Sequence, residues 1–449
     1  MKEFQTPLSK LLLPGLRTDE RAGNGLITCK NVRPVAGVLH YPGILTQPVT
    51  DPLASFDWPF PTLMEGQSGR YLGCRHYLYA LSSTYTLTPL TAWFSSAERW
   101  SFADFQSYQV FHNGNLAIIK DVASGDFFFD YAFPTCKTLI NFRGQLILGN
   151  TIDGDNWLRW SHINYNDFTI EVDNEAGASP IPVAGPIYRI MYLHSGPDMS
   201  GRDRGCFVIY AEGGIVISRP YAEPTVTFGF KQSNSMYGVT NFGCVGGHED
   251  EHLFIDNRGF LHSLTTKGDE IIGYKEFMQP LIANDPVISY DRIEKQYFIS
   301  TETKCYVFSK SGLAELDQII SSTWIDGTSL YISGYTPTTL TIELSSDELD
   351  FSLRSKKHLS TLGFKINSDG KCYASVEYKD LITGLYKQTP YKLLSPAGIC
   401  YPSVAGVDFR ILLKVTNFTH FQLDEAYASW KLIDKHAIRG IYGNSQATA

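Results

Sequence analysis

The residue types with the clearest chemical potential form the pentapeptide His248-Glu249-Asp250-Glu251-His252. In a helix, this H-E-x-x-H spacing would place both imidazoles on one face, where they could bind zinc with Glu249 as the general base. The flanking sequence favours a different structure, because Cys244-Val-Gly-Gly247 precedes the pentapeptide and an apolar run starting at Leu253 follows it. In a turn before a strand, positions four apart lie about 13 Å from each other, which is too far for one metal ion to bridge.

A convincing third zinc ligand is also missing from the sequence. Ile255, Gly259 and His262 do not follow the spacing of the metzincin peptidases. Glu270 or Glu276 would need a second helix, which the sequence does not indicate. We therefore assign no metal-binding residue and expect a polar turn between strands, with zinc peptidase activity as the third of three functional hypotheses.

Carbohydrate binding or cleavage is the second hypothesis. Asp153-Gly-Asp-Asn-Trp157 is similar to the Asp-box turns of sialidase-like propellers, although its Asp and Gly are adjacent. Trp157 and Trp160 could form a platform for a sugar ring, together with Tyr165 and Phe168, but packing between sheets is the commoner role of such aromatics. An Asp box is itself structural. A glycosidase would also need two carboxylates about 5 to 9.5 Å apart, which the sequence cannot identify.

The only dense basic cluster consists of Arg354, Lys356, Lys357 and His358. It could contact DNA or an acidic partner, or it could be a solvated surface. The chain has no G-x-x-x-x-G-K-[ST], no G-x-S-x-G and no G-x-G-x-x-G that opens a helix. Nucleotide binding and common hydrolase chemistry therefore lack their minimum motifs, and we assign no catalytic residue, no cofactor-binding residue and no cofactor.

Composition indicates the elements that must position these residues. Hydrophobic residues make up 43% and charged residues 19% of 449 positions, with 26 Tyr, 27 Phe, 38 Gly and 22 Pro, which favours short strands and tight turns over long helices.

The net charge of -8 argues against a protein that holds nucleic acid by neutralising phosphates. The eight cysteines include no C-x-x-C pair, so we expect reduced core cysteines. No run approaches the ~20 apolar residues of a membrane span, so we expect folding in the cytosol.

One local pattern recurs between about residues 55 and 335: an apolar run, a short polar turn containing glycine, and a second apolar run. This pattern predicts successive antiparallel hairpins. The clearest copies are residues 110–119, 139–148, 207–217, 253–261 and 306–313. Their spacing is a loose multiple of the roughly 40 to 50 residues of a four-stranded propeller blade, which predicts about six blades. A multi-sheet sandwich is the competing architecture.

We predict an all-β chain with four regions. Residues 1–50, rich in Pro and Gly, should form an extended N-terminal arm with one short strand near residues 26–32. Residues 51–335 should form the β-propeller. Alternating strands over residues 336–440 indicate a C-terminal β-sandwich-like platform domain, and residues 441–449 a flexible tail.

Four stretches carry a resemblance to a known family. They are Gly25-Leu-Ile-Thr-Cys-Lys-Asn-Val-Arg-Pro34 with Tyr41-Pro-Gly43, Trp157-Leu-Arg-Trp-Ser161 with Asn166-Asp-Phe168, Leu253-Phe-Ile-Asp-Asn-Arg-Gly-Phe-Leu261 with Ile272-Gly-Tyr274, and Phe421-Gln-Leu-Asp-Glu-Ala-Tyr427 with Ile438-Arg-Gly-Ile-Tyr-Gly443. They resemble the tail hub and nozzle proteins of short-tailed bacteriophages, which include head-completion or stabilisation proteins and tail tubular protein B. Each motif is short, and together they span most of the chain.

The resemblance implies a non-enzymatic component of the virion tail, made in the host cytoplasm. It implies a cyclic homo-oligomer, a hexamer, that extends the portal channel and helps to retain and then conduct DNA. The implied partners are further copies of the chain, the head-to-tail adaptor and portal proteins, and other tail proteins such as fibres, spikes or a needle. DNA would pass without specific binding, which an acidic wall would favour. The N-terminal arm would lie over a neighbouring subunit. The alternative function is a carbohydrate-binding or glycosidase-type propeller.

Overall fold

The computed structural model describes residues 3–8, 15–17, 25–41, 62–91, 99–164, 166–171, 174–194, 205–220, 227–233, 236–325, 329–335, 339–353, 355–380 and 383–433. The chain divides into two compact units. The propeller unit comprises residues 46–303 and 319–335, and the platform unit comprises residues 1–45, 304–318 and 336–449. Almost every described element is a strand, and none of the described helices is long and apolar enough to cross a membrane.

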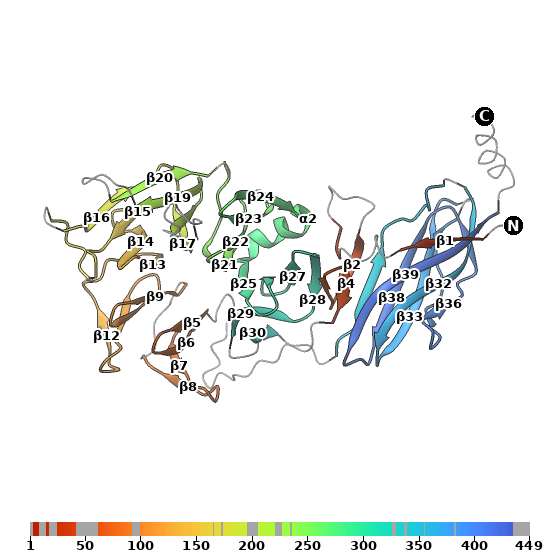
Figure 1. The fold of residues 1–449 in the computed structure, drawn as a ribbon, viewed down its shortest axis with the longest axis horizontal. Helices are drawn as coiled ribbons and strands as arrows, with labels where there is room; N and C mark the ends of the chain where they lie inside the picture. The colour runs from red at the N-terminus through yellow and green to blue at the C-terminus, as the bar shows by residue number, and fades with distance from the viewer. Residues whose placement is uncertain are drawn as a thin grey trace, which may run out of the picture. The chain divides into compact units, whose positions relative to one another are not determined.

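Five four-stranded antiparallel sheets form the blades of the propeller unit, and each is a meander in chain order (Figure 1). The blades are β5 (Thr62–Gly66), β6 (Gly69–Gly73), β7 (Leu78–Leu81) and β8 (Leu87–Pro89); β9 (Ser101–Phe105), β10 (Tyr108–His112), β11 (Ala117–Asp121) and β12 (Phe127–Asp130); β13 (Thr138–Phe142), β14 (Gln145–Thr151), β15 (Gly154–Trp160) and β16 (Gly177–Pro180); β17 (Ile187–Leu193), β18 (Cys206–Ala211), β19 (Gly214–Pro220) and β20 (Phe228–Gln232); and β21 (Val245–His248), β22 (Glu251–Ile255), β23 (Leu261–Thr265) and β24 (Gly268–Gly273).

Two hairpins and three short helical segments complete the described elements of this unit. They are β25 (Val287–Asp291) with β26 (Gln296–Ser300), β29 (Ile319–Ile325) with β30 (Ser329–Tyr335), η2 (Phe242–Cys244), α2 (Lys275–Met278) and η3 (Gln279–Asn284). The first strands contact one another in series, from β5 through β9, β13, β17, β21, β25 and β29 and back to β5. This closed series is the arrangement expected of a propeller.

The all-β propeller prediction is confirmed, but the blade count differs, with five four-stranded blades against about six expected. The difference arises at residues 287–316, where β25, β26, β27 and β28 are consecutive strands of a ten-stranded sheet and not a separate four-stranded one. β25 and β26 belong to the propeller unit, whereas β27 (Cys305–Ser309) and β28 (Gly312–Leu316) belong to the platform unit. There β28 pairs in parallel with β2 (Leu26–Lys30). A local hairpin pattern cannot reveal that this sheet continues through β2, a strand from the start of the chain.

Alternate residues of a middle strand enter two different cores, one on each face of the blade. In β14, Leu146 and Leu148 pack with Phe105 and Val110 of the preceding blade, while Ile147 packs with residues of the following blade. β18 repeats the pattern, since Phe207 and Ile209 join one cluster and Val208 and Tyr210 another. Side chains alternate across a strand, so a sheet covered on both faces is apolar at successive positions. This explains the unbroken apolar runs of the predicted hairpins.

All five predicted hairpins are present as paired strands. The β13–β14 turn shows how the sequence encodes them. Arg143 and Gly144 both have positive φ, 55° and 81°, as a two-residue turn of type I′ requires. Glycine adopts this conformation without a steric cost, which is why it marks these turns.

The remaining strands belong to two sheets, which are antiparallel apart from the parallel pair β2–β28. One has the order β3-β4-β39-β32-β36, with β1 also on β39 and β37 also on β32; the other is a ten-stranded sheet with the order β25-β26-β27-β28-β2-β31-β38-β33-β34, with β35 also on β33. The bounds are β1 (Glu3–Pro7), β3 (Arg33–Val35), β4 (Val38–His40), β31 (Ile342–Ser346), β32 (Lys357–Ser368), β33 (Lys371–Lys379), β34 (Tyr386–Gln388), β35 (Lys392–Leu393), β36 (Ile399–Cys400), β37 (Val404–Gly406), β38 (Phe409–Thr416) and β39 (Phe421–Leu432).

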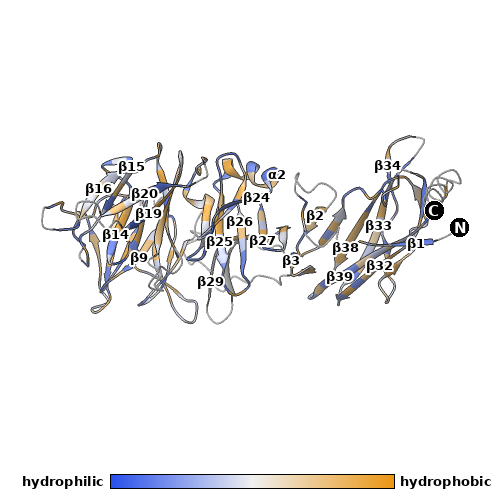
Figure 2. Cartoon of the chain, turned by 45° about the horizontal axis from the view of Figure 1, so that its top comes forward, coloured by the Kyte–Doolittle hydropathy of each residue, from blue (hydrophilic) through white to orange (hydrophobic). Residues whose placement is uncertain are grey.

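Burial alternates along β38 and β39, and hydropathy alternates with it (Figure 2). Phe351 joins the two sheets, because its ring stacks on Trp430 of β39 at 5.4 Å and lies 5.8 Å from Phe409 of β38. Such one-sided burial is typical of a sandwich in which each sheet covers one face of the other. The predicted β-sandwich-like platform is therefore confirmed.

The described part of the predicted N-terminal arm is paired within its own chain, and its contact with a neighbouring subunit stays a prediction. Its described residues belong to the sheets of their own chain: β1 pairs with β39, and β2 lies between β28 and β31. Leu26 and Cys29 of β2 are fully buried. An extended Pro- and Gly-rich segment can be an integral strand when distant strands provide both of its partners. The expected tail at residues 441–449 lies outside the described residues, as does Ile438–Gly443 of the resemblance.

Adjacent residues of β2 provide a matched test of this arrangement. Leu26→Ala should lower the free energy of unfolding by about 2 to 5 kcal/mol, because it leaves a cavity at a fully buried position. Ile27→Ala, at a position 36% exposed in the same strand, should cost less than about 1 kcal/mol. Denaturant unfolding of the full chain measures both, and equal effects would contradict the placement of β2. Deletion of residues 1–45 should abolish cooperative folding of the platform unit.

Candidate functional site

The H-E-x-x-H pentapeptide is a β-hairpin, not a helix. His248 ends β21 and Glu251 begins β22, and these two residues are paired across the turn. His252 is paired with Gly247, one step further along the ladder. Since paired residues share a face and successive residues alternate, His248 and His252 lie on opposite faces of the sheet. One metal ion cannot bind both.

His252 is fully buried, and both of its ring nitrogens are occupied. Nε2 lies 2.8 Å from the carbonyl oxygen of Tyr192, to which it must donate, and Nδ1 lies 2.8 Å from the hydroxyl of Tyr210, from which it must then accept. Burial lowers the pKa of His252 to about 3, so the imidazole is neutral. The ring therefore links two blades and has no lone pair left for a metal.

His248 is partly exposed and stacks on Tyr290, with ring centroids 4.4 Å apart. Its Nδ1 accepts a hydrogen bond of 3.3 Å from the backbone N–H of Asp250. Burial lowers its pKa although the nearby carboxylates of Asp250 and Glu251 act in the opposite direction. Within the described ranges, no three His, Cys, Asp or Glu side chains are grouped so that they could hold a metal ion.

The Asp-box-like segment stabilises the β14–β15 hairpin. Asp153 Oδ2 accepts from Thr151 Oγ1 and lies 3.3 Å from an Nη of Arg159. Gly154 has φ of 155°, and a Cβ atom there would lie 2.5 Å from the indole of Trp157. Trp157 thus packs over the glycine of its own turn, which is a structural role.

The aromatic residues near this hairpin do not form a common platform. Trp160 is buried against Phe228 and donates from Nε1 to the carbonyl oxygen of Glu175 at 2.8 Å. Phe168 is buried in a different core, edge-on to Phe133. Tyr165 lies outside the described residues. Among the described residues, this arrangement favours packing over stacking on a sugar.

The basic cluster does not form one surface. Lys357 is fully buried at the start of β32, and its ammonium donates to the carbonyl oxygens of Leu353 and Ser355. Lys356 is exposed, and His358 lies 3.3 Å from the Ser403 hydroxyl. Arg354 lies outside the described residues. Alternation along the chain thus buries Lys357 and leaves Lys356 and His358 on the other side, so among the described residues Lys357 does not contribute to a surface patch.

Sequence reasoning missed a buried network centred on His262, which it had considered only as a possible zinc ligand. His262 Nε2 lies 3.2 Å from Asp256 Oδ2, and Nδ1 lies 3.0 Å from Asp269 Oδ1. With a carboxylate oxygen at each nitrogen, both nitrogens must donate, which requires the imidazolium form. Burial opposes that charge, but the hydrogen bonds to Asp256 and Asp269 outweigh it and raise the pKa of His262.

Asp256 also orders the β22–β23 turn. Its Oδ1 accepts from the backbone N–H groups of Arg258 and Phe260, and its Oδ2 accepts from the Arg258 guanidinium at 2.9 and 3.0 Å. Burial alone would raise the pKa of Asp256, but these bonds and that of His262 lower it. The guanidinium packs on Tyr237 and Phe260. The signal in the sequence was the Asp-Asn-Arg-Gly turn, whose Asp serves as an Asx-type acceptor.

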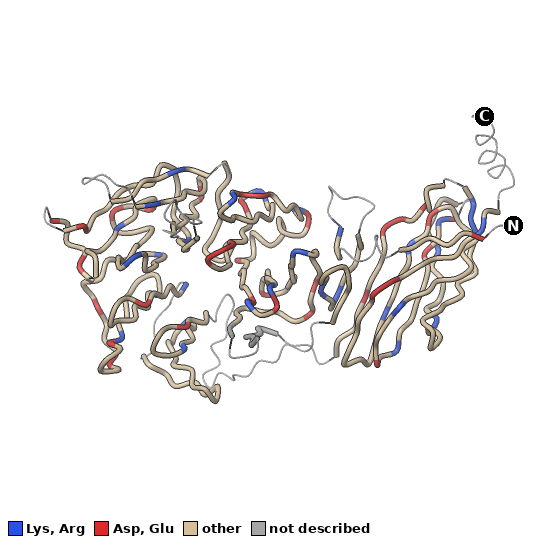
Figure 3. The backbone as a smooth tube through the Cα atoms, viewed as in Figure 1, with Lys and Arg blue, Asp and Glu red and all other residues tan. Residues whose placement is uncertain are grey.

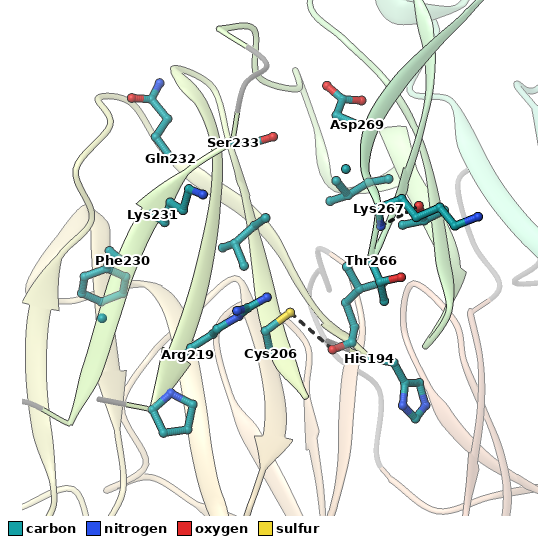
Figure 4. Close-up of a pocket in the computed structure, with 17 residues that line it drawn as sticks. His194, Cys206, Arg219, Phe230, Lys231, Gln232, Ser233, Thr266, Lys267 and Asp269 are labelled. Carbon is teal, nitrogen blue, oxygen red and sulfur yellow. Dashed lines mark hydrogen bonds between the residues drawn. The ribbon is translucent and has the colours of Figure 1, made fainter. Parts of the chain in front are cut away.

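A cavity of about 480 Å³ lies between the β17–β20 blade and the β21–β24 blade (Figure 4). Its wall carries the cations Arg219, Lys231 and Lys267. Cys206 is buried and donates from its thiol to the carbonyl oxygen of Leu193 at 3.3 Å. The His194 imidazole points away from Cys206 in Figure 4 and lies 3.7 Å from Glu249. The described lining residues thus do not pair a nucleophile with a base.

The His262 network predicts an unusual pH dependence. Because its folded-state pKa is raised, His262 should contribute stability fully below its unfolded pKa of about 6.5, and that contribution should be lost as the pH rises through the folded value. His262→Gln should cost about 3 to 5 kcal/mol at pH 6, and less at higher pH. Urea unfolding of both proteins across pH 5 to 9 measures this.

For His252 we expect the opposite dependence of stability on pH. Its pKa is lowered to about 3, so its neutral burial should favour the folded state more as the pH rises from about 3 to 6.5. The difference in the free energy of unfolding between the wild type and His252→Gln should therefore widen as the pH rises through that range. A His262→Gln difference that is constant with pH would show that His262 is uncharged in the native protein.

Comparisons with known proteins yield structural likenesses only. No family model matches the sequence, and no curated protein matches it at a significant level. Similar solved structures include PorZ, a surface component of the type-IX secretion system of Porphyromonas gingivalis (11% identity, TM-score 0.36, 63% of this chain and 35% of PorZ). A further example is BamB from Moraxella catarrhalis, with 9% identity and a TM-score of 0.35 over 62% of this chain and 76% of BamB. Another is the Pan2 WD40 domain of Neurospora crassa, with 7% identity and a TM-score of 0.38 over 63% of this chain and 89% of that domain. The match spans about a third of PorZ. At these scores the likenesses carry no functional argument.

Proposed function

We propose that the chain is a non-enzymatic structural subunit in the tail of a short-tailed bacteriophage, where copies form a hub or nozzle ring that extends the portal channel. Its other partners would be the adaptor and portal proteins and further tail proteins. The four stretches that resemble tail hub and nozzle proteins support this role. The observation on which the proposal chiefly rests is an apolar surface on the platform unit, described next.

Residues 383–403, which we call the edge segment, contain the short strands β34, β35 and β36. β34 and β35 pair with β33 of one sheet, and β36 pairs with β32 of the other. Within this segment Leu385 is 69%, Leu393 61% and Tyr401 63% exposed, and Tyr391 is 42% exposed. Large apolar side chains that gather on a surface commonly mark an interface, and tyrosine is enriched at such interfaces.

A second apolar surface lies on the propeller unit. β12 is the terminal strand of its sheet, and Phe128, Phe129 and Tyr131 on and beside it are 45%, 38% and 83% exposed. An unpaired strand edge with exposed aromatic residues is prone to pair with another chain unless a partner covers it. Two different apolar surfaces on one chain support heterologous contacts, in which one surface of a copy meets the other surface of the next copy. Such contacts close into a ring when the rotation that relates neighbouring copies divides a full turn.

Charge distribution in the platform unit supports passage of DNA without binding. Described cations lie beside carboxylates: Arg410 is 3.2 Å from Glu348 and 3.5 Å from Glu377, and Lys414 is 3.3 Å from Glu343. Figure 3 shows basic and acidic residues interspersed along these strands. Phosphate neutralisation needs clustered, available cations, so a surface of this kind would not retain DNA.

Assembly of the purified full chain tests the proposal. We expect native mass spectrometry and negative-stain electron microscopy to show closed rings, with six copies per ring. Leu393→Ser combined with Tyr401→Ser should shift the population toward monomers, because each change removes apolar surface that the ring would bury. Ile271→Ser, at a position 53% exposed outside both surfaces, is the matched control and should assemble as the wild type does. A wild-type protein that stays monomeric at high concentration would contradict the proposal.

A further inference from the structure

The axis of the propeller unit contains a cavity with an unusual concentration of positive charge. The cavity, about 240 Å³ in volume, is lined by residues from β5, β17, β21, β25 and β29. Its described lining contains three arginines, Arg99, Arg189 and Arg292, and no carboxylate. Five serine and threonine side chains also line it: Thr62, Ser289, Ser321, Ser322 and Thr323. Three cations and several donors around a small space are what an anion requires.

Arg189 is held in place by its surroundings. One Nη donates to the carbonyl oxygen of Val245, and the guanidinium carbon lies 4.6 Å from the ring centroid of Phe242. Burial lowers the pKa of Arg189 to about 10. Burial likewise lowers the pKa of Arg99 to about 10; the charge of Arg189 acts in the same direction and Asp285 acts against it. The two guanidiniums are therefore near enough to repel each other in a poorly solvated site.

Ser289 provides a donor that the protein itself leaves unused. Its Oγ is buried and has no hydrogen-bond partner among the described residues. Two neighbouring hydroxyls are already engaged: Ser322 Oγ accepts from the backbone N–H of Leu63, and Thr323 Oγ1 donates to the carbonyl oxygen of Tyr290. Buried polar groups are nearly always paired, so an unpaired hydroxyl beside a cationic cavity points to a ligand.

Glycines bring the backbone close to the cavity wall. A Cβ atom on Gly246 would lie 2.4 Å from the carbonyl oxygen of Ile288, and one on Gly243 would lie 2.0 Å from that of Pro286. Neither position could hold a larger residue without moving the backbone. A second cavity, of about 500 Å³, shares Arg189 and Arg292 in its lining but also includes Glu65 and Glu249. Because these two carboxylates line the larger cavity, an anionic ligand should bind in the smaller cavity, whose described lining has three arginines and no carboxylate.

We infer that the axial cavity is a binding site for a small tetrahedral oxyanion, an inorganic phosphate or the phosphate group of a monoester, with Arg189, Arg292 and Ser289 as donors. The size of the cavity excludes a nucleic-acid duplex, and the inference does not depend on the proposed role in a phage tail. Guanidinium groups bind phosphate through paired N–H donors, and the Ser289 hydroxyl supplies one more.

Calorimetric titration of the full chain with inorganic phosphate at low ionic strength tests the site. We expect saturable binding of one phosphate per chain. Arg292→Gln should weaken it at least about 10-fold, because a hydrogen bond to a charged group is lost. Arg143→Gln removes an exposed arginine from the β13–β14 turn of the same unit and should leave the affinity unchanged. No saturable binding, or equal weakening in both variants, would overturn the inference.

Ser289→Ala separates ligand binding from folding. Since the hydroxyl has no partner in the ligand-free protein, the variant should keep the wild-type melting temperature without phosphate but show a smaller rise when phosphate is added. An equal rise in both proteins would contradict a role for Ser289 in binding. A parallel titration with phenyl phosphate identifies the source: binding as tight as that of inorganic phosphate indicates a monoester group, and much weaker binding indicates the free ion.

Discussion

The propeller unit depends on one constraint: each blade must be covered on both faces by its neighbours. A middle strand such as β14 or β18 therefore sends alternate side chains into two separate cores, Leu146 and Leu148 into one and Ile147 into the other. Apolar burial on both faces stabilises such a blade only when both neighbours are present. The closed series of contacts from β5 to β29 and back supplies these neighbours for the whole unit.

The same constraint decides what polar side chains between the blades can do. Water is excluded there, so each buried polar group needs a partner from the protein. His252 meets this need as a neutral ring between Tyr210 and Tyr192, and His262 meets it as a cation between Asp256 and Asp269. Two histidines ten residues apart are thus in different protonation states, one neutral and one positively charged. Ser289 is one of a few buried groups that have no hydrogen-bond partner among the described residues, and it lies beside the three arginines of the axial site.

In the platform unit, strands from the two ends of the chain are paired. β1 pairs with β39 over five residues, and β2 fills a place between β28 and β31. Several stretches far apart in the chain must therefore come together before this unit is complete. Its most exposed large apolar side chains among the described residues lie in the edge segment, where strands are short and pairing is limited to a few residues. Because the interior strands are fully paired and the edge strands are not, we propose the edge segment as the interface of this unit.

The sequence by itself determined the local structure. Apolar runs on either side of turn glycines such as Gly144 predicted the hairpins, since an apolar strand and a turn's positive φ are properties of a few neighbouring residues. The same reasoning predicted that His248 and His252 would not share a helix face. Only the tertiary structure decided the long-range partners: the pairing of β28 with β2, the neutral state of His252 against the charged state of His262, and the three arginines at the axis. These depend on contacts between residues up to several hundred positions apart, which no local pattern records.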